Sequence, residues 1–139
     1  MHDRLPVAAV LAAVTLAATT GCSSVSTTPP VDPVGSWTLS SDPSSRMVLH
    51  EDGSLAVVDM PYDIACDVDA PWSGLPECAD RSAPVSFTGT WRLADGDPHA
   101  VRLATDDRRV STGYRDGAEL GFWVGSLDRP EPTYRYVHD

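Results

Sequence analysis

The sequence contains no lysine, and its ten basic residues are arginines scattered among twenty aspartates and glutamates. The formal net charge is −10 at pH 7. Proteins that bind nucleic acid through its backbone need clustered positive side chains, so this composition argues against a nucleic-acid partner. With 42% hydrophobic and 22% charged residues, the composition is otherwise that of an ordinary folded domain.

The sequence also lacks a hydrophobic run that could span a membrane as a helix, which takes about 20 residues. Its longest apolar run, residues 5–18, follows Arg4 and precedes small residues that end in Gly21-Cys22. A charged start, an apolar stretch and small residues before a cleavage point are typical of an export signal. We therefore expect residues 1–21 to be a signal peptide.

The residues before Cys22 resemble the lipobox of bacterial lipoproteins, in which the signal is removed just before a cysteine that receives a diacylglyceryl group. Gly21 fits this motif. The resemblance implies that Cys22 is modified by lipid, with palmitate or a similar acyl chain, and anchors the protein to the extracytoplasmic face of the cell membrane. The alternative is an ordinary secretory signal in which Cys22 is incidental.

A lipid-modified Cys22 leaves Cys66 and Cys78, which are separated by eleven residues. Disulfides persist outside the cytoplasm, so we expect these two residues to be paired. Their spacing fits neither a zinc site nor a redox C-x-x-C motif, and we expect no metal and no cofactor.

Residues 22–33 have no apolar periodicity and hold three prolines in their last five positions, which predicts a flexible tether. The folded domain then covers residues 34–139. It contains short, β-rich, alternating runs separated by turn residues, and no convincing helical period. The expected strands are residues 34–40, 45–50, 54–60, 84–93, 99–105, 108–114, 118–125 and 133–138. Asp-Gly pairs at residues 52–53, 95–96 and 116–117 predict tight hairpins.

A sequence echo strengthens this all-β prediction. Gly35-Ser-Trp37 recurs 54 residues later as Gly89-Thr-Trp91, so we expect two similar half-units, with the strand, hairpin and following strand repeating in step. Two such units predict a small antiparallel up-and-down β-barrel of about eight strands.

Gly-x-Trp at the start of a strand resembles lipocalin-like barrels, and the resemblance implies that Trp37 or Trp91 closes one barrel end beneath a ligand cavity. The whole chain also resembles small lipoproteins of high-GC actinobacteria, through the lipobox, the two Gly-x-Trp motifs, residues 49–55 and residues 125–130. These motifs are structural, so the resemblance implies location and fold and leaves the activity open.

Sequence motifs for catalysis are missing: there is no Gly-x-Ser-x-Gly, no His-Glu-x-x-His and no glycine-rich phosphate loop. We therefore expect no enzyme. His99 shares strand parity with Val101 and Leu103, and is either a hydrogen-bonded structural residue or a ligand contact at the barrel mouth. The aspartates at 63, 67, 69, 106 and 107 favour solvated loop charge over a calcium site, because an EF-hand's Gly and terminal Glu are missing.

The segment of residues 61–83 is longer than a minimal barrel needs. It carries Tyr62 just before the first cysteine of the predicted disulfide and Trp72 between the two cysteines. Its apolar groups either fold over one barrel end or form a recognition surface. The orientation of Trp123 is also open, because its neighbours Phe122 and Val124 lie on the other face of the strand. Trp123 either faces outward, where a partner could contact it, or faces the barrel interior.

Two functions follow. In the first, a non-enzymatic lipoprotein binds a small apolar or amphipathic molecule inside its barrel, with His99 and the 61–83 segment at the mouth. In the second, the protein recognises another cell-envelope protein through that segment, with Tyr62, Trp72 and Trp123 as contact residues.

Overall fold

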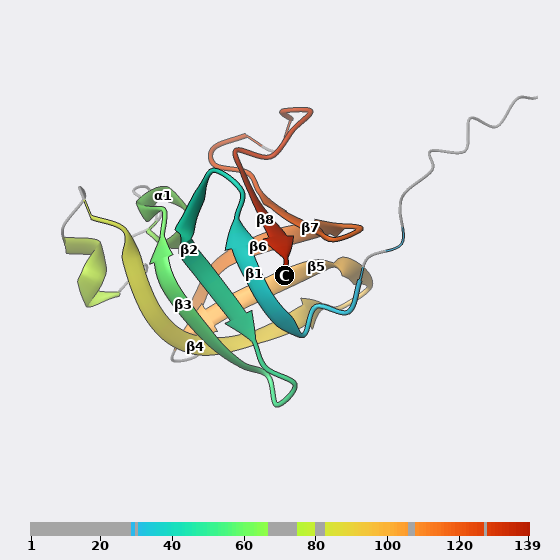
Figure 1. Cartoon of the computed structure of the whole chain (residues 1–139), viewed down its shortest axis with the longest axis horizontal. Helices are drawn as coiled ribbons and strands as arrows, with labels where there is room; N and C mark the ends of the chain where they lie inside the picture. Colours follow the sequence, from blue (N-terminus) through green and yellow to red (C-terminus); the bar gives the residue numbers. More distant parts are fainter. Residues whose placement is uncertain (1–28, 30, 67–74, 80–82, 106–107, 127) are drawn as a thin grey trace, which may run out of the picture.

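The computed structural model describes residues 29, 31–66, 75–79, 83–105, 108–126 and 128–139. Within them lie eight strands and two helices of four residues each (Figure 1). In chain order these are β1 (Gly35–Leu39), β2 (Asp42–Leu49), β3 (Ser54–Met60), α1 (Tyr62–Ala65), η1 (Pro76–Ala79), β4 (Val85–Ala94), β5 (Asp97–Thr105), β6 (Arg108–Asp116), β7 (Glu119–Phe122) and β8 (Tyr134–His138). No helix in this part of the chain is long and apolar enough to cross a membrane.

Several predictions fall outside the described residues. Residues 1–28 include the expected signal peptide, Cys22 and most of the expected tether. Trp72 and four of the five aspartates considered as calcium ligands, Asp67, Asp69, Asp106 and Asp107, also lie outside.

The strands form one closed barrel. Each strand pairs antiparallel with the next one along the chain, and β8 returns to β1, where His138 lies opposite Trp37. This confirms the predicted all-β, up-and-down barrel of eight strands. The predicted strand ranges agree with the observed ones to within two residues, except that β2 begins at Asp42 and not at residue 45, and β7 ends at Phe122 and not at residue 125. The chain leaves the ladder there and turns at Gly125, whose φ is +87°.

The two barrel ends carry different connections, because strand direction alternates around an up-and-down barrel. One end holds the β1–β2, β3–β4, β5–β6 and β7–β8 connections. We call it the stapled end, because the β3–β4 connection contains Cys66 and Cys78. The other end holds the remaining three turns, the start of β1 and the end of β8, and we call it the terminal end.

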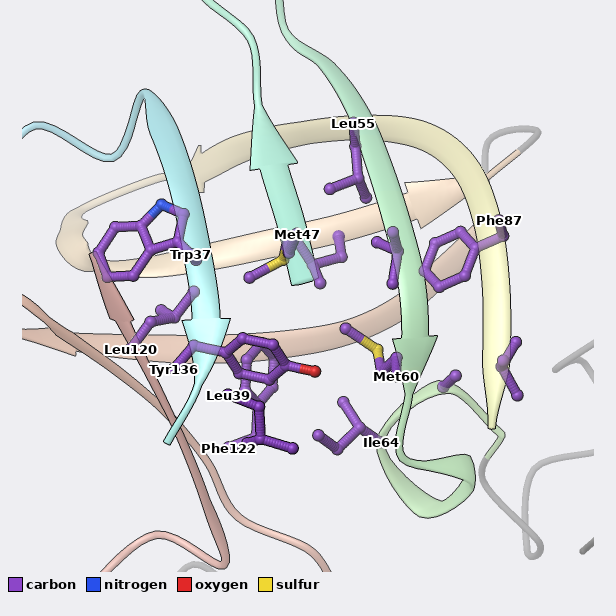
Figure 2. Packing of buried hydrophobic residues seen from close by; sticks show 14 of the residues in the cluster. Trp37, Leu39, Met47, Leu55, Met60, Ile64, Phe87, Leu120, Phe122 and Tyr136 are labelled. Carbon is purple, nitrogen blue, oxygen red and sulfur yellow. The ribbon is translucent and has the colours of Figure 1, made fainter. Parts of the chain in front are cut away.

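Apolar side chains fill the described interior of the barrel, and they point into the space that the strands enclose (Figure 2). Trp37, Tyr136 and Phe122 are the largest of the side chains that are less than 2% exposed. The cluster consists of Trp37, Leu39, Met47, Leu49, Leu55, Val57, Met60, Ile64, Ala65, Cys66, Val85, Phe87, Val101, Leu103, Leu120, Phe122 and Tyr136. Such interiors pack at close to crystalline density, and these side chains form the hydrophobic core of the barrel.

The two tryptophans of the sequence echo have different environments. Trp37 is fully buried, whereas Trp91 is only half-buried, and its indole N–H donates to the His50 carbonyl at 2.8 Å. Trp37 lies two residues before the last paired residue of β1, Leu39, but Trp91 lies three residues before that of β4, Ala94. The ends of the two strands are therefore offset by one residue more than the sequence repeat. As a result, the two tryptophans lie at different distances from their turns.

Candidate functional site

The described parts of the β3–β4 connection cover the stapled end of the barrel. Cys66 and Cys78 form the predicted disulfide, with 5.7 Å between their Cα atoms. Ile64 on α1 is 4% exposed and belongs to the barrel core. The Tyr62 hydroxyl donates to the Cys78 carbonyl at 2.9 Å, and Leu75 packs against the core. The apolar groups described here therefore fold over the barrel end.

Hydrogen bonds also tie this cap to β8. The hydroxyl of Tyr134 donates to the carboxylate of Asp63 at 3.0 Å, joining the start of β8 to α1. Burial raises the pKa of Tyr134, and the bond to Asp63 adds to that shift. Together with the disulfide and the Tyr62 bond, this contact holds α1 in one position over the barrel.

One polar pair lies inside the core beneath the cap. The hydroxyls of Ser45 and Tyr136 share a hydrogen bond at 2.6 Å, and both residues are fully buried. Burial raises the pKa of Tyr136 to about 12, although the Ser45 bond opposes the shift. The Tyr136 ring packs edge-on against Phe122 at 5.7 Å between centroids. A buried phenol satisfied by one hydroxyl is a structural arrangement, since both polar groups already have their partner.

The terminal end is closed by the chain that precedes β1. Val31 donates its N–H to the Gly117 carbonyl at 3.0 Å, and the Trp37 indole donates to the Pro33 carbonyl at 2.9 Å. The Arg115 guanidinium donates to the carbonyls of Val31 and Pro98. Arg115 is 7% exposed, and this burial lowers its pKa.

Arg115 was missed at the sequence level, because it lies between the expected strands of residues 108–114 and 118–125. Its strand parity with the buried Gly113 was the available signal, because alternate residues of a strand share one face. Arginine is rarely so deeply buried. Its two terminal guanidinium nitrogens donate to backbone carbonyls, whereas its buried Nε makes no hydrogen bond with the described residues. Its role here is to clasp the incoming chain to the start of β5.

The other predicted contact residues lie apart. His99 is half-buried at the terminal end, and its Nδ1 is hydrogen-bonded to the Arg115 carbonyl at 3.1 Å. Trp123 lies in the β7–β8 connection, packs edge-on against Tyr114 and donates to the Arg129 carbonyl at 3.1 Å. His99 thus lies at the opposite barrel end from Tyr62 and Trp123, which both belong to connections at the stapled end. Each of the three side chains is hydrogen-bonded to a backbone carbonyl.

Metal-binding geometry is not seen in the described ranges, where no three His, Cys, Asp or Glu side chains gather closely enough to hold an ion. Two surface grooves are lined by described residues. The first, of about 690 Å³, is lined largely by small polar residues of β3 and β4, among them Ser54, Thr88 and Thr90. The second, of about 570 Å³, is lined by Asp52, Gly53, Thr90, Trp91, Arg92, Arg102, Ala104 and Arg109.

Comparison with known proteins assigns no family. No family model matches the chain, and no curated protein or solved structure matches it either.

Proposed function

We propose that this protein is a non-enzymatic recognition module, lipid-anchored through Cys22 on the extracytoplasmic face of the cell membrane, which binds an envelope protein on its outer surface. The observation that carries the proposal is the filled barrel. A ligand pocket usually has a volume of about 300–1,000 Å³, and the described interior is occupied by core side chains instead.

Both barrel ends support binding on the outside. The terminal end is covered by the chain before β1 and by Arg115, and the stapled end by α1. A molecule entering from the stapled end would displace Ile64, which belongs to the core. Removing a side chain of this size from a core costs about 2–5 kcal/mol, which disfavours entry.

The direction of the tether favours the stapled end as the binding surface. Val31 is hydrogen-bonded to the β6–β7 turn, so the tether leaves the barrel at the terminal end. An anchor at Cys22 would hold that end towards the membrane and present the stapled end away from it. The disulfide and the Tyr62 and Tyr134 bonds keep α1 ordered, which reduces the entropy lost on binding.

Photo-crosslinking in the native host tests this proposal. A crosslinking residue replaces Ala79, which is exposed at the stapled end, or Ala118, which is exposed in the β6–β7 turn. We expect a defined protein adduct from position 79 and none from position 118. Equal adducts from both positions, or none from position 79, would contradict the use of the stapled end.

The second candidate function is binding of a small apolar or amphipathic molecule in the barrel, as lipocalin-like barrels do. Native mass spectrometry of the protein purified gently from its own membrane separates the two. A retained small molecule, beyond the diacylglyceryl mass, favours this carrier function. A mass that shows only the lipid anchor and one disulfide favours surface recognition.

A further inference from the structure

The second groove has an unusual concentration of positive charge for so acidic a chain. Three of the ten arginines, Arg92, Arg102 and Arg109, line it, although the net charge of the protein is −10. They come from the neighbouring strands β4, β5 and β6. Arg92 and Arg102 have the outward strand parity, since Val101 and Leu103 on either side of Arg102 are fully buried.

The strand register brings these arginines together around small side chains. Arg92 lies directly opposite Arg102, and in the next outward row Ala104 lies between Thr90 and Arg109. Small residues thus occupy the centre of the patch, and guanidinium groups its edges. The volume of about 570 Å³ lies in the usual range for small-ligand sites.

A cross-strand pair of arginines needs a physical reason. Directly opposed residues on antiparallel strands have Cβ atoms about 4.5–5.5 Å apart, and like charges at that separation destabilise the sheet. Arg92 is partly compensated by Asp95, whose carboxylate lies 3.5 Å away. Asp52, the acidic residue of the groove lining, accepts hydrogen bonds from the Ser54 N–H and hydroxyl. These two bonds lower the pKa of Asp52, so its carboxylate stays ionised. The carboxylate is hydrogen-bonded to Ser54 of its own turn.

We propose that this groove binds an anionic phosphate group, with Arg92, Arg102 and Arg109 as its ligands. Guanidinium groups present N–H donors in a planar fork that matches phosphate oxygens, and a bound dianion or monoanion would offset the Arg92–Arg102 repulsion. Trp91 also lines the groove, where its backbone N–H donates to the Gly53 carbonyl and its indole N–H donates to the His50 carbonyl.

The phosphate has two possible sources, a soluble phosphate ester and a phospholipid head group. The groove borders the β2–β3 turn, which is at the terminal end. Residues 22–30, even fully extended, span at most about 30 Å, so an anchor at Cys22 would keep that end near the membrane surface. The head-group source alone rests on the proposed anchorage, whereas the soluble source does not depend on it.

NMR titration of the full-length chain in bicelles tests the site. The observed signals are the Trp91 indole N–H and the backbone amides of Gly53 and Thr90. One arm adds glycerol 3-phosphate to the protein in neutral phosphatidylcholine bicelles. The other arm replaces part of the phosphatidylcholine by phosphatidylglycerol. We expect saturable shifts at these three signals in at least one arm, and the responding arm identifies the source.

Arginine variants give the matched control. Arg102→Gln should weaken the response at least about tenfold, because hydrogen bonds to charged groups are worth about 1.5–3 kcal/mol each. Arg129→Gln makes the same charge change at an exposed site in the β7–β8 connection and should leave it unchanged. Arg102→Gln should also unfold at an equal or higher urea concentration, since it relieves the repulsion with Arg92.

Three results would overturn the proposal. One is the absence of shifts at the Trp91, Gly53 and Thr90 signals in both arms. Another is equal weakening by the variants at 102 and 129, which would indicate general charge attraction. The third is a variant at position 102 that lowers stability and leaves the phosphate response unchanged, which would make this arginine structural.

Discussion

Replacing Phe122 by alanine tests whether the barrel is as full as the structure shows. Phe122 is 1% exposed and packs edge-on against Tyr136. An added Cβ on Gly113 would lie 2.9 Å from the Phe122 ring and 2.8 Å from Leu120, so the surroundings of the ring are tightly packed. Removing the ring from such a site should leave an apolar cavity.

The expected cost follows from that packing. Phe→Ala substitutions in well-packed cores cost about 3–5 kcal/mol, because the transfer free energy is lost and a cavity remains. A domain of this size has an unfolding free energy of about 5–15 kcal/mol, so the variant should still fold. Benzene should enter the cavity, and at about ten times its Kd it should restore about 1.4 kcal/mol.

Urea unfolding of the wild-type and Phe122→Ala proteins, with and without benzene, measures both quantities. Benzene should stabilise the variant and leave the wild-type protein unchanged. A loss below about 1.5 kcal/mol would refute the reasoning, because a well-packed core cannot lose a phenyl ring so cheaply. Stabilisation of the wild-type protein by benzene would reveal an existing apolar chamber and return the small-ligand function to first place.

Three further perturbations follow from the same structure. Replacing Cys66 and Cys78 together by alanine should lower the unfolding free energy by about 3 kcal/mol, and an unchanged urea midpoint would contradict a stabilising disulfide. The pKa of Tyr136 is about 12 when folded against about 10 when unfolded, so the stability that this residue contributes is constant well below pH 10. That contribution should fall by about 2 kcal/mol as the pH rises from 10 to 12, and Tyr136→Phe should remove most of that slope. Gly113→Ala should cost about 1–3 kcal/mol, since its Cβ would lie 2.8 Å from Leu120, and a neutral result would indicate free space there.

The fold could be predicted from the sequence because its signals are local. Apolar residues alternate with polar ones along residues 84–93, and Asp-Gly pairs occupy the hairpins, where Gly53 and Gly96 adopt φ values of +83° and +77°. The pairing of Cys66 with Cys78 followed from counting, once Cys22 was assigned to the lipid. Each of these inferences needs only neighbouring residues or a count.

The candidate sites could not be predicted in the same way. His99 and Trp123 were chosen as single polar or aromatic residues on strands, and in the structure both make structural hydrogen bonds. The arginine groove was not foreseen, because Arg92 and Arg109 are far apart in the sequence and become neighbours only through β5.

The sequence by itself determined the strands, the hairpins and the disulfide. The alternation of apolar and polar residues and the turn residues are local signals, and the disulfide follows from the number of cysteines. Only the tertiary structure decided how the strands are registered against each other. That register buries Trp37 but leaves Trp91 half-exposed, and it fills the barrel. It also places Arg92 opposite Arg102. These outcomes depend on side chains from different strands meeting in space, and a shift of one residue moves a side chain to the other face of the sheet.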